Sequence, residues 1–295
     1  MKIEPTSYRD WPEAYRCTAG PVELLLVTSL GPRILSLRFD GGENLLYEDD
    51  TGFQVGAWRL YGGHRFTTAP ESAASYPPDN APCEVTVEGD RLGIRPPPTQ
   101  GLRRCLEIRT APDHSSFAIR HLLRNTGSQP WQGAAWAITC VPPAGKVVVP
   151  QTSAAPRFWT SPGESYADAS SPQWQAADDH FVVEPSGEKG KVGLASERGW
   201  LAWLGADATF VIQGPARIPQ AAYPDEGCNV EVFTCADYLE LETLGPLATL
   251  RPGQELAHEQ HWLIIPRGFA PEAWRTIDEL SESSRASAQA ARAPA

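Results

Sequence analysis

Short apolar stretches recur along the whole chain and are separated by residues that favour turns. Many alternate polar and apolar residues with a period of two, which is typical of half-buried β-strands. The stretches cover residues 22–29, 33–39, 83–89, 103–111, 117–125, 131–141, 146–151, 180–185, 191–196, 199–205, 208–215, 229–235, 238–246 and 258–266. No helical pattern recurs between them, which argues against parallel βαβ units. The chain therefore predicts an all-β fold, a large antiparallel sandwich.

Two segments break this pattern. Residues 152–179 contain much Ser, Ala and Pro, and predict a long loop that carries Trp159, Tyr166 and Trp174. Residues 271–292 predict a short C-terminal helix, because Pro271 suits a first helical turn. We therefore expect one β-sandwich domain over residues 1–270, followed by a C-terminal helix and frayed tail over residues 271–295.

Composition and charge limit the classes of ligand that the chain is suited to bind. The 295 residues are 41% hydrophobic, enough for a large core, and 36 carboxylates outnumber 25 Lys and Arg side chains. An acidic chain without a basic run is poorly suited to nucleic acid or to an anionic membrane. Neutral ligands such as sugars remain open. The start of the chain lacks the apolar core of a signal peptide, and no stretch reaches membrane-spanning length, so we expect a cytoplasmic protein.

Motifs for several kinds of chemistry are absent from the sequence. The six cysteines form no CxxC pair, and no histidine lies at zinc-finger spacing from them, so free thiols are expected. There is no HExxH, calcium loop, GxSxG or phosphate loop. The sequence therefore predicts neither a metal site nor a cofactor, and it gives no support for a serine or cysteine nucleophile.

A carboxylate cluster is predicted where two strands meet near residue 236. If residues 229–235 and 238–246 form a hairpin, Glu231 shares a face with at least one of Glu240 and Glu242. Like charges on neighbouring strands are unfavourable unless a cation, a shared proton or bound hydroxyls compensate them, and their pKa values rise. The alternative is a solvated outer face, on which carboxylates need no such explanation.

A second polar cluster occurs in residues 61–71, shortly after Trp58. The glycine pair at 62–63 precedes His64 and Arg65, and Glu71 follows. We interpret this stretch as a loop that holds a polar ligand, because imidazole exchanges protons near neutral pH and guanidinium binds oxygen atoms in pairs. The alternative is a surface loop in which Arg65 pairs with Glu71.

Longer motifs resemble those of a known superfamily. The stretches SLGPRILSLRF (29–39), FAIRHLLRNTGSQPWQGAAWAIT (117–139), GCNVEVFT (227–234) and PLATLRPGQELAHEQHWLII (246–265) are similar to galactose mutarotase-like proteins. Together with GGHRF and APE in residues 62–71, YPPDNAP (76–82), TQGLRR (99–104), YPDEGCNVEVFT (223–234) and LELETLGPLATLRPG (239–253), they resemble one bacterial family of unknown function within it. The resemblance covers about residues 20–266.

The resemblance implies a β-supersandwich whose concave face holds a carbohydrate. Aldose 1-epimerases of this fold open the sugar ring with a glutamate base and a histidine acid. By position Glu231 matches the glutamate, His64 and Arg65 fall in the region of the substrate-binding groups, and Asp225 is a candidate for the family's aspartate. This sequence departs from the pattern where Trp136 lies near the usual acid histidine.

Three functions follow from the resemblance. The first is anomer interconversion, with Glu231 as base and His64 as acid. The second is carbohydrate binding without catalysis, and the third is a lyase or another carbohydrate-active enzyme on the same scaffold. The partner in each case is a small-molecule carbohydrate, and the oligomeric state stays open. The predicted binding residues are Arg65, Glu71, Asp225, Trp58, Trp136 and Glu242.

Overall fold

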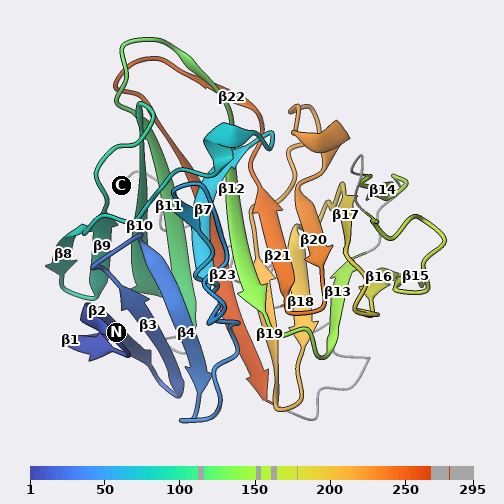
Figure 1. The fold of residues 1–295 in the computed structure, drawn as a ribbon, viewed down its shortest axis with the longest axis horizontal. Helices are drawn as coiled ribbons and strands as arrows, with labels where there is room; N and C mark the ends of the chain where they lie inside the picture. Colours follow the sequence, from blue (N-terminus) through green and yellow to red (C-terminus); the bar gives the residue numbers. More distant parts are fainter. Residues whose placement is uncertain (112–115, 151–153, 161–164, 178, 267–278, 280–295) are drawn as a thin grey trace.

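Two large antiparallel sheets face each other in the computed structural model, which describes residues 1–111, 116–150, 154–160, 165–177, 179–266 and 279 (Figure 1). The first sheet has the order β1 (Lys2–Tyr8), β2 (Trp11–Ala19), β3 (Val22–Val27), β4 (Arg33–Phe39), β7 (His64–Ala69), β12 (Trp131–Val141), β21 (Leu239–Leu244), β20 (Val230–Thr234), β17 (Gly190–Leu194) and β14 (Arg157–Phe158), with β22 (Ala248–Leu250) also on β12. The second has the order β15 (Trp174–Ala176), β16 (His180–Val183), β13 (Lys146–Pro150), β18 (Trp200–Leu204), β19 (Ala208–Gln213), β23 (Glu255–Pro266), β11 (Phe117–Asn125), β10 (Leu102–Thr110), β9 (Arg91–Arg95) and β8 (Glu84–Glu88).

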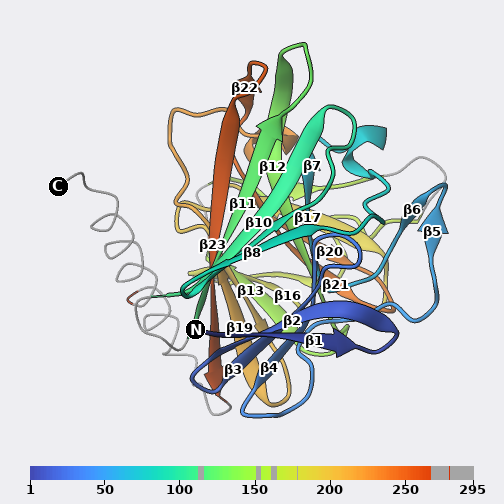
Figure 2. The same ribbon diagram turned by 90° about the vertical axis from the view of Figure 1, so that its left-hand side faces the viewer.

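Three short elements complete the described chain. A two-stranded ribbon of β5 (Gln54–Val55) and β6 (Trp58–Arg59) stands apart from both sheets (Figure 2). Two 3₁₀ turns follow at η1 (Ala73–Ser75) and η2 (Asp225–Gly227). None of the described helices is long and apolar enough to cross a membrane.

The core lies between the two sheets, as alternation along half-buried strands requires. Leu24, Leu26 and Leu37 from the first sheet belong to the same buried cluster as Ile94 and Leu106 from the second. Burying these side chains contributes roughly 1.5–3 kcal/mol each before conformational entropy is counted. The predicted all-β sandwich is therefore confirmed, and the paired strands are all antiparallel in the described residues.

Strand positions agree closely with the sequence pattern in the middle of the chain. The predicted strands over residues 117–125 and 131–141 appear as β11 and β12 with the same bounds. The pattern missed β1 and β2, whose polar residues hide the alternation, and it placed residues 64–69 in a loop although they form β7.

The predicted C-terminal helix and the predicted 152–179 loop fall wholly or partly outside the described residues. The predicted C-terminal helix falls on residues 271–292, which lie outside the described residues apart from Glu279. The described parts of the predicted 152–179 loop include two short strands, β14 and β15, one at an outer edge of each sheet. All six cysteines are free thiols.

Candidate functional site

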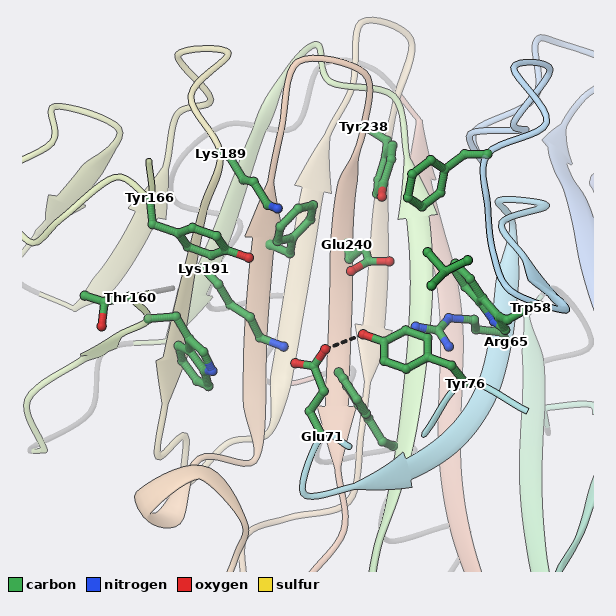
Figure 3. A pocket seen from close by; sticks show the side chains of 15 residues that line it. Trp58, Arg65, Glu71, Tyr76, Thr160, Tyr166, Lys189, Lys191, Tyr238 and Glu240 are labelled. Atoms are coloured by element: carbon green, nitrogen blue, oxygen red, sulfur yellow. Dashed lines mark hydrogen bonds between the residues drawn. The ribbon is translucent and has the colours of Figure 1, made fainter. Parts of the chain in front are cut away.

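A pocket of about 520 Å³ lies on the face of the first sheet that points away from the core (Figure 3). Strands β7, β12, β21, β20 and β17 each supply at least one side chain to it. Eight aromatic rings form much of its wall: Phe53, Trp58, Tyr76, Trp136, Trp159, Tyr166, Phe233 and Tyr238. Its charged lining consists of Arg65, Glu71, Lys189, Lys191 and Glu240.

Lys191 forms the floor of the pocket together with two carboxyl groups beneath it. Its Nζ donates a hydrogen bond to Glu242 Oε2 at 2.9 Å and lies 2.8 Å from Glu231 Oε2. Trp136 Nε1 also donates to Glu242 Oε2, at 2.6 Å. Glu231 and Glu242 are directly opposite on β20 and β21, and both are fully buried. The predicted carboxylate pair is therefore present, and a lysine from β17 is the compensating cation.

Burial and neighbouring charges shift the pKa values of Glu231 and Lys191 in this cluster. Burial raises the pKa of Glu231 well above its usual value, and Glu242 adds to this, although Lys191 acts in the opposite sense. Burial lowers the pKa of Lys191, but Glu242 and Glu231 outweigh it, so the pKa ends well above the ordinary lysine value. Glu242 accepts from both Lys191 and Trp136, whereas neither oxygen of Glu231 has an aligned hydrogen bond in the described part of the chain. The shifts therefore favour the proton-bearing forms of Glu231 and Lys191, and Lys191 donates its hydrogen bond to Glu242.

Arg65 enters the pocket from β7 between aromatic rings. Its guanidinium carbon lies 5.2 Å from the centre of the Trp58 ring, 5.3 Å from Tyr76 and 6.0 Å from Trp136. The residue is only 6% exposed, and Figure 3 shows its guanidinium directed into the pocket. These rings attract the cation, but they do not supply a carboxylate that would pair with it.

Glu240 is the carboxyl that reaches the pocket from β21. It is half-buried, lies opposite Phe233 on β20, and has Cys140 Sγ at 3.8 Å from its Oε1. Burial raises the pKa of Glu240 to about 7, with a further contribution from Glu242 and opposition from Arg65. A carboxyl with this pKa exchanges protons readily at neutral pH.

The rim comes from segments distant in sequence. Glu71 accepts a hydrogen bond from the Tyr76 hydroxyl, so the alternative in which Arg65 pairs with Glu71 in a surface loop is not found among the described residues. Trp159 stacks with Arg157, whose guanidinium carbon lies 4.2 Å from the ring centre. A Cβ atom at Gly193 would lie only 2.8 Å from the Trp159 ring, so this glycine permits the ring's close approach to β17. Trp159, Thr160 and Tyr166 thus build one wall of the pocket.

Two predicted site residues lie elsewhere. Asp225, in η2, forms an ion pair of 3.0 Å with Arg157 and is outside the pocket lining. His64 is fully buried in the core, where Nδ1 lies 2.9 Å from Thr139 Oγ1 and Nε2 lies 2.7 Å from His121 Nε2. The expectation that His64 faces Glu231 across a cleft is wrong, because successive residues of a strand point to opposite faces and Arg65 takes the pocket side.

The other predicted residues come together at the pocket. Trp58, Arg65, Glu71 and Trp136 line it, while Glu231 and Glu242 lie directly behind Lys191. Sequence reasoning missed Lys191 altogether and left Glu240 out of the site. The available signal was a lysine inside the apolar strand GKVGL, where a buried charge requires a partner. The described residues contain no group of three or more His, Cys, Asp or Glu side chains placed to hold a metal ion.

Solved structures share this architecture. A galactose mutarotase-like protein from Clostridium acetobutylicum superposes with a TM-score of 0.56 at 10% identity, over 90% of this chain and 99% of that one. A galactose mutarotase related enzyme from Lactobacillus acidophilus gives 0.54 at 7% identity, over 85% and 97%. A TPR-domain containing protein from Parabacteroides distasonis gives 0.61 at 15% identity; the match covers 86% of this chain and 47% of that chain, about half of its length.

These similarities establish the galactose mutarotase-like fold, as the sequence motifs predicted. No curated protein matches the sequence. Residues 70–265, about two thirds of the chain, match the family described as Domain of unknown function (DUF4380). The chain therefore belongs to the DUF4380 family and carries a galactose mutarotase-like β-sandwich.

Proposed function

We propose that this protein binds a monosaccharide in the pocket and interconverts its anomers. The observation that carries the proposal is the pocket itself: a volume suited to one sugar, with aromatic walls and an accessible carboxyl on its floor. Aromatic rings stack on the apolar face of a pyranose, and charged groups bind its hydroxyls. The likeness to mutarotase-related structures supports the same assignment by analogy of fold.

Glu240 is the proposed proton-exchanging group. Ring opening transfers the proton of the anomeric hydroxyl to the Glu240 carboxylate and breaks the bond between the anomeric carbon and the ring oxygen, and the Glu240 carboxyl then returns a proton to that oxygen. Ring closure on the other face of the carbonyl reverses these steps, so no proton is consumed. Glu240 reaches the pocket and has a pKa of about 7, whereas Glu231 lies behind Lys191. Lys191 and Arg65 supply N–H donors for charge that develops on the sugar oxygens.

Anomer exchange followed by NMR, on a panel of aldoses, uronates and sugar phosphates, tests this proposal. We expect Glu240→Gln to lower the catalysed rate by about 10²–10⁴-fold, the range for loss of a general acid or base. The matched control is Glu84→Gln on the exposed strand β8, which should leave the rate unchanged.

A third variant separates two assignments of the base. The family resemblance assigns the base to Glu231, so a rate lost in Glu231→Gln but kept in Glu240→Gln would overturn our assignment while leaving the activity in place. Absence of catalysed exchange with every sugar in the panel would contradict the mutarotase proposal.

Carbohydrate binding without catalysis is the second candidate. It is favoured by the position of His64 in the core and by Trp136 in the pocket wall, because no imidazole lines the described part of the pocket. Saturable sugar binding in calorimetry, together with an unchanged anomer exchange rate, would establish it.

A further inference from the structure

We propose that the sugar is anionic and that Arg65 binds its carboxylate or phosphate group. This inference deepens the proposed function and rests on it. It assigns the pocket a substrate class, an aldose that carries a negative charge, in place of the neutral sugars that an acidic chain first suggests.

Arg65 is a buried arginine in the wall of the pocket. Among the residues that the structure describes, Arg65 forms no ion pair and its Nε is buried without a hydrogen-bond acceptor. Leaving a buried charge unpaired is unfavourable, and the attraction of Trp58, Tyr76 and Trp136 compensates it only in part.

Arg33 and Arg65 are both buried, but they differ in their partners. Arg33 is also buried, but it donates a hydrogen bond of 2.8 Å to Asp79 and is a structural ion pair. Arg65 has rings where Arg33 has a carboxylate, and its guanidinium is directed into the pocket (Figure 3). The planar guanidinium matches carboxylate and phosphate groups with two parallel hydrogen bonds, so an anionic ligand completes the site.

The charged side chains that line the pocket with Arg65 also favour an anionic ligand. The whole chain has a net charge of −11, yet Arg65, Lys189 and Lys191 line one pocket. Lys191 is already paired with Glu242, and Glu240 has a pKa of about 7, which Arg65 helps to lower, so this carboxyl is ionised only in part. Glu71 is engaged by the Tyr76 hydroxyl on the exposed rim. Among the described residues, Arg65 is consequently the buried cation of the pocket that forms no ion pair.

Calorimetry with matched sugars tests the inference on the intact protein. The set consists of glucose, glucuronate and glucose 6-phosphate, with galactose and galacturonate as a second pair. We expect a charged member to bind at least tenfold more tightly than its neutral counterpart. The preference should shrink to about twofold in Arg65→Gln and persist in part in Arg65→Lys. Arg95→Gln, on the exposed end of β9, makes the same change in net charge outside the pocket and should preserve it.

The calorimetry results separate failure of the anionic substrate class from failure of the proposed sugar-binding function. A preference for glucuronate or galacturonate over glucose 6-phosphate identifies a carboxylate, and the reverse identifies a phosphate. Equal binding of neutral and charged sugars overturns the anionic class but leaves a carbohydrate pocket. Binding of inorganic phosphate with no binding of any sugar overturns the proposed function itself. The wild-type comparison decides between these even if an Arg65 variant does not fold.

Discussion

At the scale of single residues, the site depends on a balance between one buried cation and two buried carboxyls. Lys191 lies within 2.9 Å of both Glu231 and Glu242, and burial raises the pKa of Glu231 well above its usual value against the opposing charge of Lys191. A lysine over the rings of Trp136 and Trp159, at 4.7 and 5.1 Å, is held in place by attraction from both sides.

This balance predicts unequal effects of two substitutions on stability. Lys191→Met removes the cation and leaves buried carboxyls uncompensated, so we expect a loss of about 3–5 kcal/mol in the free energy of unfolding. Glu231→Gln replaces a carboxyl whose neutral form is favoured by burial with a neutral group of the same shape, and should cost about 1 kcal/mol or less. Urea denaturation at pH 7 measures both. Comparable losses in the two variants would show that Glu231 is ionised.

At the scale of elements, strand β7 explains both the success and the failure of the sequence interpretation. The hairpin of β20 and β21 was predictable, because strict alternation places Glu231 opposite Glu242 and Phe233 opposite Glu240. Residues 64–69 contain no polar–apolar alternation, since both faces of β7 are buried and the burial of polar groups there depends on partners from other strands. Without the strand, His64 and Arg65 could not be assigned to opposite faces. Lys191 was missed for a related reason: its partners come from β20 and β21, far away in sequence.

His64 lies on the core face of β7 and Arg65 on its pocket face, which gives a prediction for His64. His64→Gln disturbs hydrogen bonds to Thr139 and His121 in the core, and we expect it to lower the unfolding free energy by about 1–3 kcal/mol. The rate of anomer exchange and the sugar affinity should stay within about threefold of wild type, because the imidazole is on the far side of the sheet. Thermal unfolding and NMR exchange on one sample measure both. A large loss of rate at unchanged stability would restore His64 to the site.

At the scale of the whole molecule, a row of buried histidines connects the two sheets. His64 on β7 contacts His121 on β11, and His121 Nδ1 lies 2.9 Å from the carbonyl oxygen of His258 on β23. His258 in turn contacts the first sheet again, because its Nε2 lies 2.7 Å from Thr243 Oγ1 on β21. Burial lowers the pKa of His121 to about 4 and that of His258 to about 3, and it lowers the pKa of His64 well below its usual value.

The direction of these shifts predicts acid instability. Histidine titrates near 6.5 in the unfolded chain, so below that pH the unfolded state takes up protons that the native state excludes. Stability is therefore full above about pH 6.5 and falls as the pH decreases toward 4, by about 1–3 kcal/mol for each of His121 and His258. The raised pKa values of Glu231 and Glu240 act in the opposite sense, because their contribution is lost as the pH rises.

Urea denaturation of the Glu231→Gln/Glu240→Gln double variant isolates the histidine contribution. We expect its unfolding free energy to increase steeply between pH 4.5 and 6.5. A flat profile over this interval would show that the buried histidines do not titrate differently in the two states.

The wide separation in sequence of the two pocket walls also has a consequence for the lifetime of the protein. Trp58 and Tyr76 precede Trp159 and Lys191 by more than 80 residues, and these walls face each other only when β7, β12, β21, β20 and β17 are all assembled. A ligand that touches both walls binds the native state alone, and at a hundred times its dissociation constant it stabilises that state by about 2.7 kcal/mol. Fewer molecules then reach the opened forms that proteases cleave, so the abundance of this protein in a cell would follow the supply of its own ligand.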